Sequence, residues 1–317
     1  MLRPRSFALA AAGLVGLGAN CDAGKLGRIA FENSVVTSLP VRPAPHHPRA
    51  GRLHGARLAV AWLGHASALI QLDDKLILAD PLLTFTAGYF SKRLVAPAVR
   101  PREVAPVDVV LVSHMHFDHL SLDTLFALRS RIGELVLPQD GARYVPDYGI
   151  PLTELATWQS WERDGLRITA VPAQHVGWRF GIDRIFEPRS FTGYILEYRG
   201  LVVYFAGDTG YQGEHFREIR EHFPHLDLAL IPIAPLEPHD LMAHNHVNAD
   251  EALQAFLDVG ADRMIPIHFD TFINSFDAPG DADVALEKAR VARGLTTKQV
   301  MRFDIGEQRI LLPVRVP

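Results

Sequence analysis

Residues 107–120 read Val-Asp-Val-Val-Leu-Val-Ser-His-Met-His-Phe-Asp-His-Leu, an apolar strand pattern followed at once by four side chains able to bind a metal. Side chains two positions apart in an extended segment point the same way, so His114 and His116 can reach one ion together. Asp118 and His119 lie where the chain turns toward the next helix and can reach a second ion. Burying three imidazoles and a carboxylate without a cation is costly unless each is paired. The segment therefore predicts a metal site.

Three single residues farther along the chain share one context, because each is a metal-ligand type placed just past an apolar strand pattern. They are His175, Asp208 and His268. Loops that follow strands are where functional side chains collect. We therefore expect these three residues to join residues 114–119 in space.

Short apolar runs alternate with helical patterns from residue 57 onward. Expected strands cover residues 58–63, 66–72, 75–79, 107–112, 134–137, 166–171, 194–198, 201–206, 226–231 and 263–267. Expected helices cover residues 121–129, 213–222, 249–259 and 283–293, with Asp73-Asp74 as a hairpin turn and Asn248 as a helix cap. Strands grouped early and late, with helices after each group, predict two packed sheets with helices outside.

The order His-x-His-x-Asp-His, a single His, Gly-Asp-Thr-Gly and a late His resembles the metallo-β-lactamase superfamily. Further blocks resemble the branch that contains the phospholipase D hydrolysing N-acylphosphatidylethanolamine: Trp62-Leu63-Gly64-His65-Ala66, Ala79-Asp80-Pro81, Pro172-Ala173-Gln174-His175, Phe205 to Tyr211, and His246-Val247-Asn248-Ala249-Asp250-Glu251-Ala252. The similarity covers residues 57–312. It implies an α/β fold, an αββα sandwich of two mixed β-sheets with outer helices.

The resemblance also distributes the candidate ligands over two metal ions. It implies that one ion is bound by His114, His116 and His175, the other by Asp118, His119 and His268, and both by a bridging Asp208. Nitrogen and carboxylate oxygen ligands without thiolate suit two Zn²⁺ ions, and Fe or Mn also fit. Two such cations lower the pKa of water to about 7, which makes hydroxide available at neutral pH.

Four residues have further expected roles, and the role of His246 follows from the resemblance. Asp118 is expected to orient the nucleophile as well as bind metal, and His246 to donate a hydrogen bond to the substrate or protonate the leaving group. Asp80 is expected to accept a hydrogen bond from a ligand imidazole, although a turn or cap role explains it equally well. His65 either lines the site or is a satisfied core residue, and the core role is favoured.

These features predict a binuclear-metal hydrolase that uses a metal-bridging hydroxide, with phosphodiester hydrolysis of the phospholipase D type as the leading activity. The alternatives are a lactonase or carboxylic ester hydrolase resembling the ascorbate-6-phosphate lactonases, and a non-catalytic metal-binding envelope protein. A β-lactamase is disfavoured, because its commonest class has Cys where Asp208 stands. The residues after His175 depart from the mammalian phospholipase pattern, which leaves long-chain lipid specificity open. Packing is favoured over lipid contact for the apolar loop residues Leu82, Leu83, Phe85, Tyr89 and Phe90.

The 317-residue chain has a formal charge of −4 and a pI near 6.4, which gives no basic footprint for nucleic acid. Arg3 and Arg5 precede the uncharged stretch 7–19, a pattern typical of an export signal and too short to span a bilayer. We expect a leader over residues 1–21, an extended arm over 22–56 and a hydrolase domain over 57–317. An exported, periplasmic or membrane-anchored protein is favoured. Lipidation of Cys21, peripheral membrane association, a cytoplasmic location and the oligomeric state stay open, and the expected substrate is a small molecule or a phospholipid.

Overall fold

The computed structural model describes residues 40–314 apart from 89–90, 187 and 274. The expected leader over residues 1–21, like residues 22–39 of the expected arm, lies outside the described residues. The described part of the arm runs along the surface of the molecule. The backbone N–H of Arg42 donates to Leu94 O (2.9 Å), and that of His46 donates to Ile305 O (3.2 Å). These contacts bury Ala44 in the arm.

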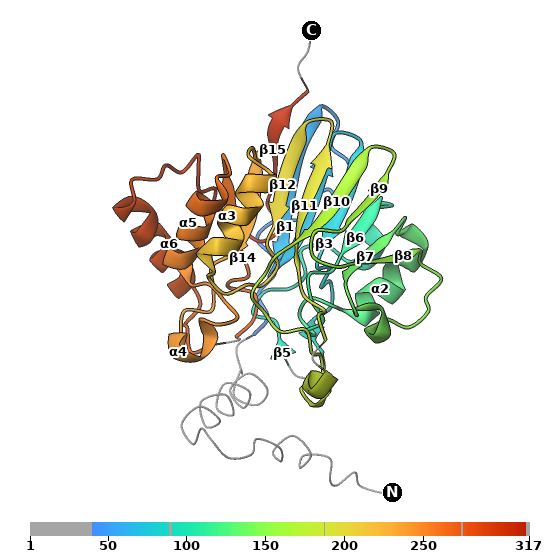
Figure 1. The fold of residues 1–317 in the computed structure, drawn as a ribbon, viewed down its shortest axis with the longest axis horizontal. Helices are drawn as coiled ribbons and strands as arrows, with labels where there is room; N and C mark the ends of the chain where they lie inside the picture. The colour runs from blue at the N-terminus through green and yellow to red at the C-terminus, as the bar shows by residue number, and fades with distance from the viewer. Residues whose placement is uncertain (1–39, 89–90, 187, 274, 315–317) are drawn as a thin grey trace, which may run out of the picture.

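Two β-sheets form the centre of the molecule (Figure 1). The first has the strand order β15-β1-β2-β3-β6-β7-β8, in which the strands are β1 (Ala56–Gly64), β2 (Ser67–Leu72), β3 (Lys75–Ala79), β6 (Val109–Leu111), β7 (Leu135–Pro138), β8 (Leu152–Leu155) and β15 (Gln308–Pro313). Pairing is antiparallel from β15 through β3 and parallel from β3 through β8. The sheet is therefore mixed.

The second sheet is also mixed and has the order β14-β13-β12-β11-β10-β9. Its strands are β9 (Ser160–Arg163), β10 (Leu166–Val171), β11 (Gly193–Tyr198), β12 (Leu201–Phe205), β13 (Leu228–Pro232) and β14 (Met264–Ile267). Pairing is antiparallel from β9 through β12 and parallel from β12 through β14. A separate ribbon pairs β4 (Thr86–Ala87) with β5 (Ser91–Lys92).

Helices cover the two sheets from outside. The helices are α2 (Leu122–Leu128), α3 (Gly213–His222), α4 (His239–Met242), α5 (Ala249–Val259) and α6 (Asp281–Ala292), and the 3₁₀ turns are η2 (Pro101–Glu103), η3 (Arg129–Arg131), η4 (Ala142–Tyr144) and η5 (Ile182–Phe186). In Figure 1, α3, α5 and α6 lie on one side of the sandwich and α2 on the other. This confirms the predicted α/β fold, an αββα sandwich of two mixed sheets with outer helices.

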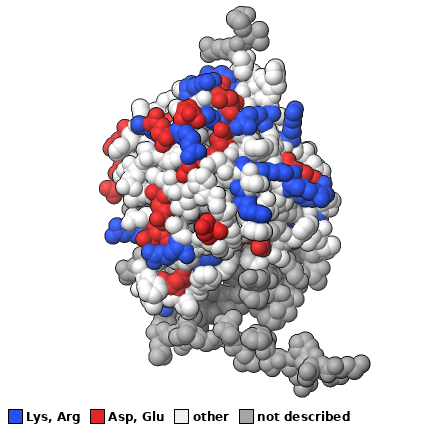
Figure 2. Space-filling model, turned by 90° about the vertical axis from the view of Figure 1, so that its right-hand side faces the viewer, with Lys and Arg blue, Asp and Glu red and all other residues white. Residues whose placement is uncertain are grey.

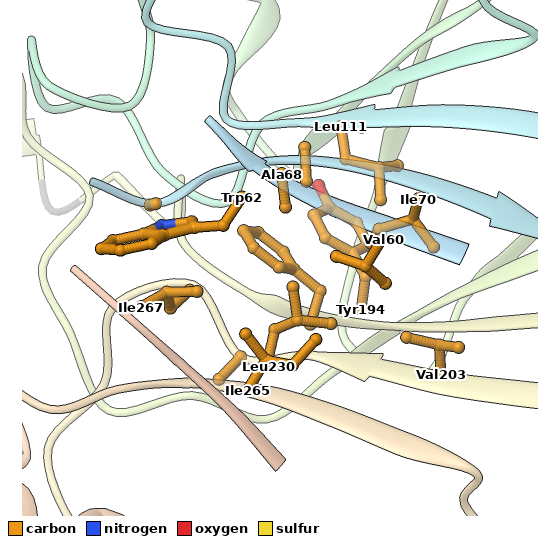
Figure 3. Close-up of a cluster of buried hydrophobic side chains, with 14 of the residues drawn as sticks. Val60, Trp62, Ala68, Ile70, Leu111, Tyr194, Val203, Leu230, Ile265 and Ile267 are labelled. Carbon is orange, nitrogen blue, oxygen red and sulfur yellow. The ribbon is translucent and has the colours of Figure 1, made fainter. Parts of the chain in front are cut away.

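Apolar side chains from both sheets meet in the middle of the sandwich (Figure 3). Val60, Trp62 and Ile70 come from the first sheet, and Tyr194 and Leu230 come from the second; each is at most 1% exposed. Burying one large apolar side chain stabilises the fold by roughly 1.5–3 kcal/mol. This core fixes the two sheets against each other, and with them the loops that follow their strands.

Most expected elements are confirmed, with small shifts at their ends. Strand β10 and helices α3 and α5 have the predicted bounds, and Asn248 caps α5 by accepting from the N–H groups of Asp250 and Glu251. The prediction of residues 107–112 as strand was too long, since β6 covers only Val109–Leu111. Strands β8, β9 and β15 were not predicted.

The surface carries charges of both signs. On the face shown in Figure 2, Lys and Arg side chains are interspersed with Asp and Glu. Among the described residues, no helix has the length and the apolar character needed to cross a bilayer.

Candidate metal centre

Strand ends bring the predicted ligands together from both sheets. His114 comes shortly after β6, His175 after β10, Asp208 after β12 and His268 directly after β14. Strands β10 and β12 both run antiparallel to β11, and β12, β13 and β14 are parallel to one another. The carboxyl ends of β10, β12 and β14 therefore lie at the same end of the second sheet. The predicted ligands lie at this end of the sandwich, where α4 and β5 are seen in Figure 1.

The first group of ligand atoms comes from His114, His116 and His175. His116 Nδ1 lies 3.0 Å from His114 Nε2 and 3.3 Å from His175 Nε2. The ligand atoms of the three imidazoles all lie within 4.8 Å of one another, as a shared cation requires. The structure thus brings together the three residues that the resemblance assigned to one ion.

The second group comes from Asp118, His119 and His268, joined by His65. Asp118 Oδ2 lies 3.8 Å from His119 Nε2 and 3.9 Å from His268 Nε2. The ligand atoms of these four residues also lie within 4.8 Å of one another. This is the set that the resemblance assigned to the other ion, and His65 is the addition.

Asp208 lies between the two groups. Its Oδ2 is 3.0 Å from His268 Nε2 and 3.1 Å from His119 Nε2 in the second group, and 4.0 Å from His114 Nε2 in the first. One carboxylate thus faces ligand atoms of both groups, which is the position expected of a bridging ligand.

Hydrogen bonds fix which nitrogen of each imidazole faces the site. His175 Nδ1 donates to Asn245 O (2.9 Å), and His268 Nδ1 donates to Ala234 O (3.1 Å). In a neutral imidazole the other ring nitrogen then carries a lone pair. The Nε2 lone pairs of both histidines are therefore available to a cation.

Asp80 orders the first-sheet side of the site. Its Oδ2 accepts from His119 Nδ1 (2.7 Å) and Ser113 Oγ (2.6 Å), and its Oδ1 accepts from Ser113 N (2.6 Å). Because the Ser113 hydroxyl proton points to Asp80, the hydroxyl oxygen accepts from His114 Nδ1 (3.0 Å). Asp80 thus meets the expectation that it accepts a hydrogen bond from a ligand imidazole, and through Ser113 it orients a second one.

His65 is buried but is not an isolated core residue. Its Nε2 donates to Asp118 Oδ2 (2.9 Å), and its backbone N–H donates to Thr271 Oγ1 (2.6 Å). Burial and the neighbouring His268 lower the pKa of His65 to about 3, so the imidazole is neutral. The favoured core role was therefore incomplete, because His65 holds one oxygen of Asp118.

The electrostatics of the site favour a bound cation. Burial alone would raise the pKa of Asp208, but His119 and His268 hold it well below its usual range. Burial would lower the pKa of His119, yet Asp208, Asp118 and Asp80 raise it well above its usual range. Three carboxylates around one imidazole make a strongly negative environment that a divalent cation would neutralise.

Unpaired buried atoms give a second test of whether metal ions fit these residues. Among the described residues, ten buried side-chain nitrogen and oxygen atoms lack a hydrogen-bond partner, and five belong to this cluster: His116 Nε2, His119 Nε2, Asp208 Oδ1, His246 Nδ1 and His268 Nε2. Leaving such a group unpaired costs about 1–3 kcal/mol. Cations between the two groups would pair His119, His268 and Asp208, so the donor set fits bound metal ions.

Access to the site is from the side of Asp118 and His246. The Asp118 side chain is 29% exposed and that of His246 is 17% exposed, whereas Asp208 and His119 are almost fully buried. His246 Nδ1 lies 3.5 Å from Asp208 Oδ2, and burial lowers the pKa of His246 to about 4. Both predicted catalytic residues therefore lie on the solvent-facing side of the site.

Three residues that shape the site were not predicted from the sequence. The Ser113 hydroxyl connects Asp80 to His114, because it donates to Asp80 and accepts from His114. Gly207 packs so tightly on Ser113 that a Cβ at residue 207 would lie 2.4 Å from Ser113 Cβ. Arg179 contacts the loop that carries His116 and Asp118. The glycine stands beside the predicted Asp208, but serine and arginine at such positions carry no motif of their own.

Comparison with known families decides what kind of molecule carries this site. The family model described as a Beta-lactamase superfamily domain matches residues 75–269, more than half of the chain. The chain belongs to the metallo-β-lactamase superfamily. This confirms the resemblance, and the matched range contains the seven ligands predicted from the sequence, whereas His65 precedes it.

Relatives of this superfamily member include enzymes and uncharacterised proteins. An uncharacterised Mycobacterium tuberculosis protein is 33% identical over 74% of this chain, and the chain spans 65% of that relative's length. N-acyl-phosphatidylethanolamine-hydrolyzing phospholipase D 1 of Caenorhabditis elegans is 31% identical over 74% of this chain and 69% of the relative. A UPF0173 metal-dependent hydrolase of Thermococcus onnurineus is 28% identical over 67% and 85%. The superfamily to which the chain belongs thus includes relatives that are named as metal-dependent hydrolases.

Solved structures of other superfamily members share the fold. The isothiocyanate hydrolase from Delia radicum gut bacteria superposes with a TM-score of 0.64 at 16% identity, covering 79% of this chain and 98% of that chain. A metallo hydrolase from Ignicoccus hospitalis gives 0.58 at 22% identity, covering 80% and 97%. At these identities the likeness concerns the αββα architecture alone.

Proposed function

We propose that this superfamily member is a binuclear zinc phosphodiesterase. His114, His116 and His175 would hold one ion, Asp118, His119 and His268 would hold the other, and Asp208 would be shared between them. The observation that carries it is Asp208, whose Oδ2 faces imidazoles of both groups at 3.0–4.0 Å. Nitrogen and carboxylate ligands suit zinc, and the proposal does not require thiolate.

When bound, such cations supply Lewis-acid chemistry: they polarise a phosphoryl oxygen and lower the pKa of water. The chain's own contribution begins with Asp118. One of its oxygens accepts from His65 Nε2 at 2.9 Å, which fixes the carboxylate at the mouth of the site. From there Asp118 can accept a hydrogen bond from the attacking water and orient it.

His246 has a different task in the proposed reaction. With its pKa lowered to about 4 by burial, the imidazole is neutral at pH 7, so it holds one N–H and no surplus proton. A neutral imidazole at the mouth of the site can donate a hydrogen bond to a phosphate oxygen as charge develops on it. This favours the hydrogen-bonding role over the general-acid role.

The phosphodiester class is supported by a relative and by the loop beside the site. The Caenorhabditis elegans relative is named as a phospholipase D, and its similarity spans 74% of this chain. Phe180, Ile182, Ile185 and Phe186 follow His175 within eleven residues and are each 60–74% exposed. An amphiphilic phosphodiester would bring an apolar group to such a loop, so we include phospholipids among the proposed substrates and peripheral membrane association among the proposed properties.

The test combines metal analysis with a panel of substrates. Purified protein should contain two zinc ions per chain and should hydrolyse a p-nitrophenyl phosphodiester faster than a lactone or a β-lactam. Asp208→Asn should lower both the zinc content and the turnover. Hydrolysis confined to lactones would overturn the phosphodiesterase proposal, and full turnover by metal-free protein would overturn the zinc site.

We propose further that the chain is exported, because Arg3, Arg5 and the uncharged stretch 7–19 have the pattern of an export signal. Cell fractionation of a bacterial host expressing the full chain should recover the protein in the envelope fractions. A double substitution of Leu14 and Val15 by Asp should retain it in the cytosol. Recovery of both forms in the cytosol would overturn export.

A further inference from the structure

Arg179 is a buried arginine on the segment that follows His175. It is 6% exposed, and its Nη1 donates to two main-chain oxygens, Met115 O (2.6 Å) and Leu120 O (3.1 Å). The guanidinium carbon lies 4.1 Å from the centre of the Phe117 ring, a cation–π distance. One side chain therefore contacts the beginning, the middle and the end of residues 115–120.

These two oxygens enclose the turn that presents the candidate ligands. Between them lie His116, Asp118 and His119, and the turn itself is closed by His119 N donating to His116 O (3.1 Å) and Leu120 N donating to His116 O (2.9 Å). The turn thus has short-range bonds within it, but its two ends are joined to each other through Arg179. A buried carbonyl without a donor costs about 1–3 kcal/mol.

Arg179 is itself held firmly from its other side. Asp183 Oδ2 accepts from Arg179 N (2.7 Å) and from Tyr144 Oη (2.7 Å), and Asp183 Oδ1 accepts from Phe180 N (2.8 Å). At the base of the segment, a Cβ on Gly177 would lie 2.2 Å from Pro188 O, so the two sides of the loop are in close contact there. The backbone from which the Arg179 side chain extends is therefore fixed by its own loop.

We propose that Arg179 is a positioning residue that sets the shape of the turn carrying His116, Asp118 and His119. The inference rests on the proposed function in one respect only, since those residues are its proposed ligands. Arg179 acts through the main chain of the turn, and its side-chain fork makes contacts that a lysine ammonium reproduces only in part.

The experiment replaces Arg179 with Met, which keeps an apolar chain against Phe117, and with Lys, which keeps the charge. Zinc affinity, measured by competition with a chromophoric chelator, should fall about tenfold or more in Arg179→Met and by less in Arg179→Lys. Hydrogen exchange of the amides of residues 116–120 should accelerate in the same order. In turnover of a p-nitrophenyl phosphodiester, kcat should fall with little change in KM.

Arg184→Met is the matched control, because Arg184 is an exposed arginine of the same loop. It should leave zinc affinity and amide exchange at the wild-type values. If Arg179→Met binds zinc as the wild type does and raises only KM, Arg179 contacts substrate and the positioning role is wrong. If Arg179→Met fails to fold, Arg179→Lys decides: unchanged zinc affinity and exchange in that variant overturn the proposal. Zinc affinity and exchange need no turnover, so failure of the phosphodiesterase proposal would be seen separately.

Discussion

Gly207 shows how closely the backbone approaches around Asp208. Its φ is +61°, a region that glycine adopts without strain. A Cβ there would lie 2.4 Å from Ser113 Cβ, and Ser113 cannot retreat because Asp80 accepts from both its N–H and its hydroxyl. The glycine is therefore required for the two sheets to bring Asp208 next to His114.

Gly207→Ala is expected to destabilise the protein by about 1–3 kcal/mol and to weaken zinc binding, because Asp208 must move away from Ser113. Urea denaturation and zinc titration measure the two effects. Gly149→Ala is the control, since Gly149 has φ +69° but no atom within 4 Å of an added Cβ. Equal zinc affinity in the two variants would contradict the prediction.

His246→Ala is expected to lower kcat roughly 10²-fold while the zinc content stays at the wild-type value. Because His246 is neutral and donates a hydrogen bond in the proposed reaction, the loss should be similar for a p-nitrophenyl ester and for an alkyl ester. His246→Gln, which keeps an N–H donor, should recover part of the rate. A loss seen only with the poor alkyl leaving group would show that His246 acts as a general acid instead.

Residue identity and spacing were enough to predict the cluster and Asp80 as a hydrogen-bond partner of one imidazole, but not the roles of Ser113 and Arg179. His114 to His119 form a dense local motif, and His175, Asp208 and His268 each follow an apolar run, so sequence alone could gather them. Ser113 and Arg179 act through hydrogen bonds whose partners are distant in the chain or belong to the backbone. No local pattern encodes such contacts, and only the fold reveals them.

At the scale of elements, the start of helix α5 is fixed by its N-cap residue Asn248, which directly precedes the helix. Asn248 Oδ1 accepts from Asp250 N (2.9 Å) and Glu251 N (3.0 Å), and Glu251 Oε2 accepts from Asn248 N (2.9 Å). Asn248→Ala should lower the free energy of unfolding by about 1 kcal/mol, measured from the urea midpoint. Asn248→Asp keeps the acceptor and should stay near the wild type; equal losses in both variants would count against the cap.

Turn η5 gives a pH-dependent prediction through Asp183. Burial raises the pKa of Asp183. The hydrogen bonds from the N–H groups of Arg179 and Phe180 and from the Tyr144 hydroxyl lower it by more, so the folded pKa lies below the ordinary value. The carboxylate therefore stabilises the fold above about pH 3.9, and this contribution disappears as pH falls through the folded pKa. Asp183→Asn should lower the thermal midpoint near pH 7, and the gap to the wild type should narrow only as the pH falls below about 4. A constant gap would contradict this.

Sequence patterns predicted the buried strands and missed those at the edges. Strands β8 and β9 are short, largely solvent-facing and polar, as in Ser160–Arg163, so no apolar run marks them. Strand β15 is only partly buried, and it exists because β1 offers it a free edge. The expected packing of the apolar loop residues 82–90 is met only in part. Leu82 and Leu83 are buried as expected, whereas Phe85 is 63% exposed. Residues 89 and 90 lie outside the described part.

For the whole molecule, metal removal is expected to lower stability, because the candidate ligands come from both sheets. A cation that binds the folded chain at a hundredfold excess over its Kd adds about 2.7 kcal/mol. Chelator-treated protein should therefore melt at a lower temperature in calorimetry, and zinc should restore the midpoint. Magnesium, which prefers oxygen ligands, should not restore it. Identical midpoints with and without chelator would argue against bound metal.

The chain crosses from the first sheet to the second between β8 and β9, so it can be cleaved there into two fragments. The turn between β8 and β9, residues 156–159, divides the candidate ligands, with residues 114–119 before it and His175, Asp208 and His268 after it. Strand β15 from the second piece nevertheless pairs with β1 in the first. Two fragments separated at this turn should thus associate by pairing β15 of the second with β1 of the first. Recovery of zinc binding on mixing would report this fragment complementation.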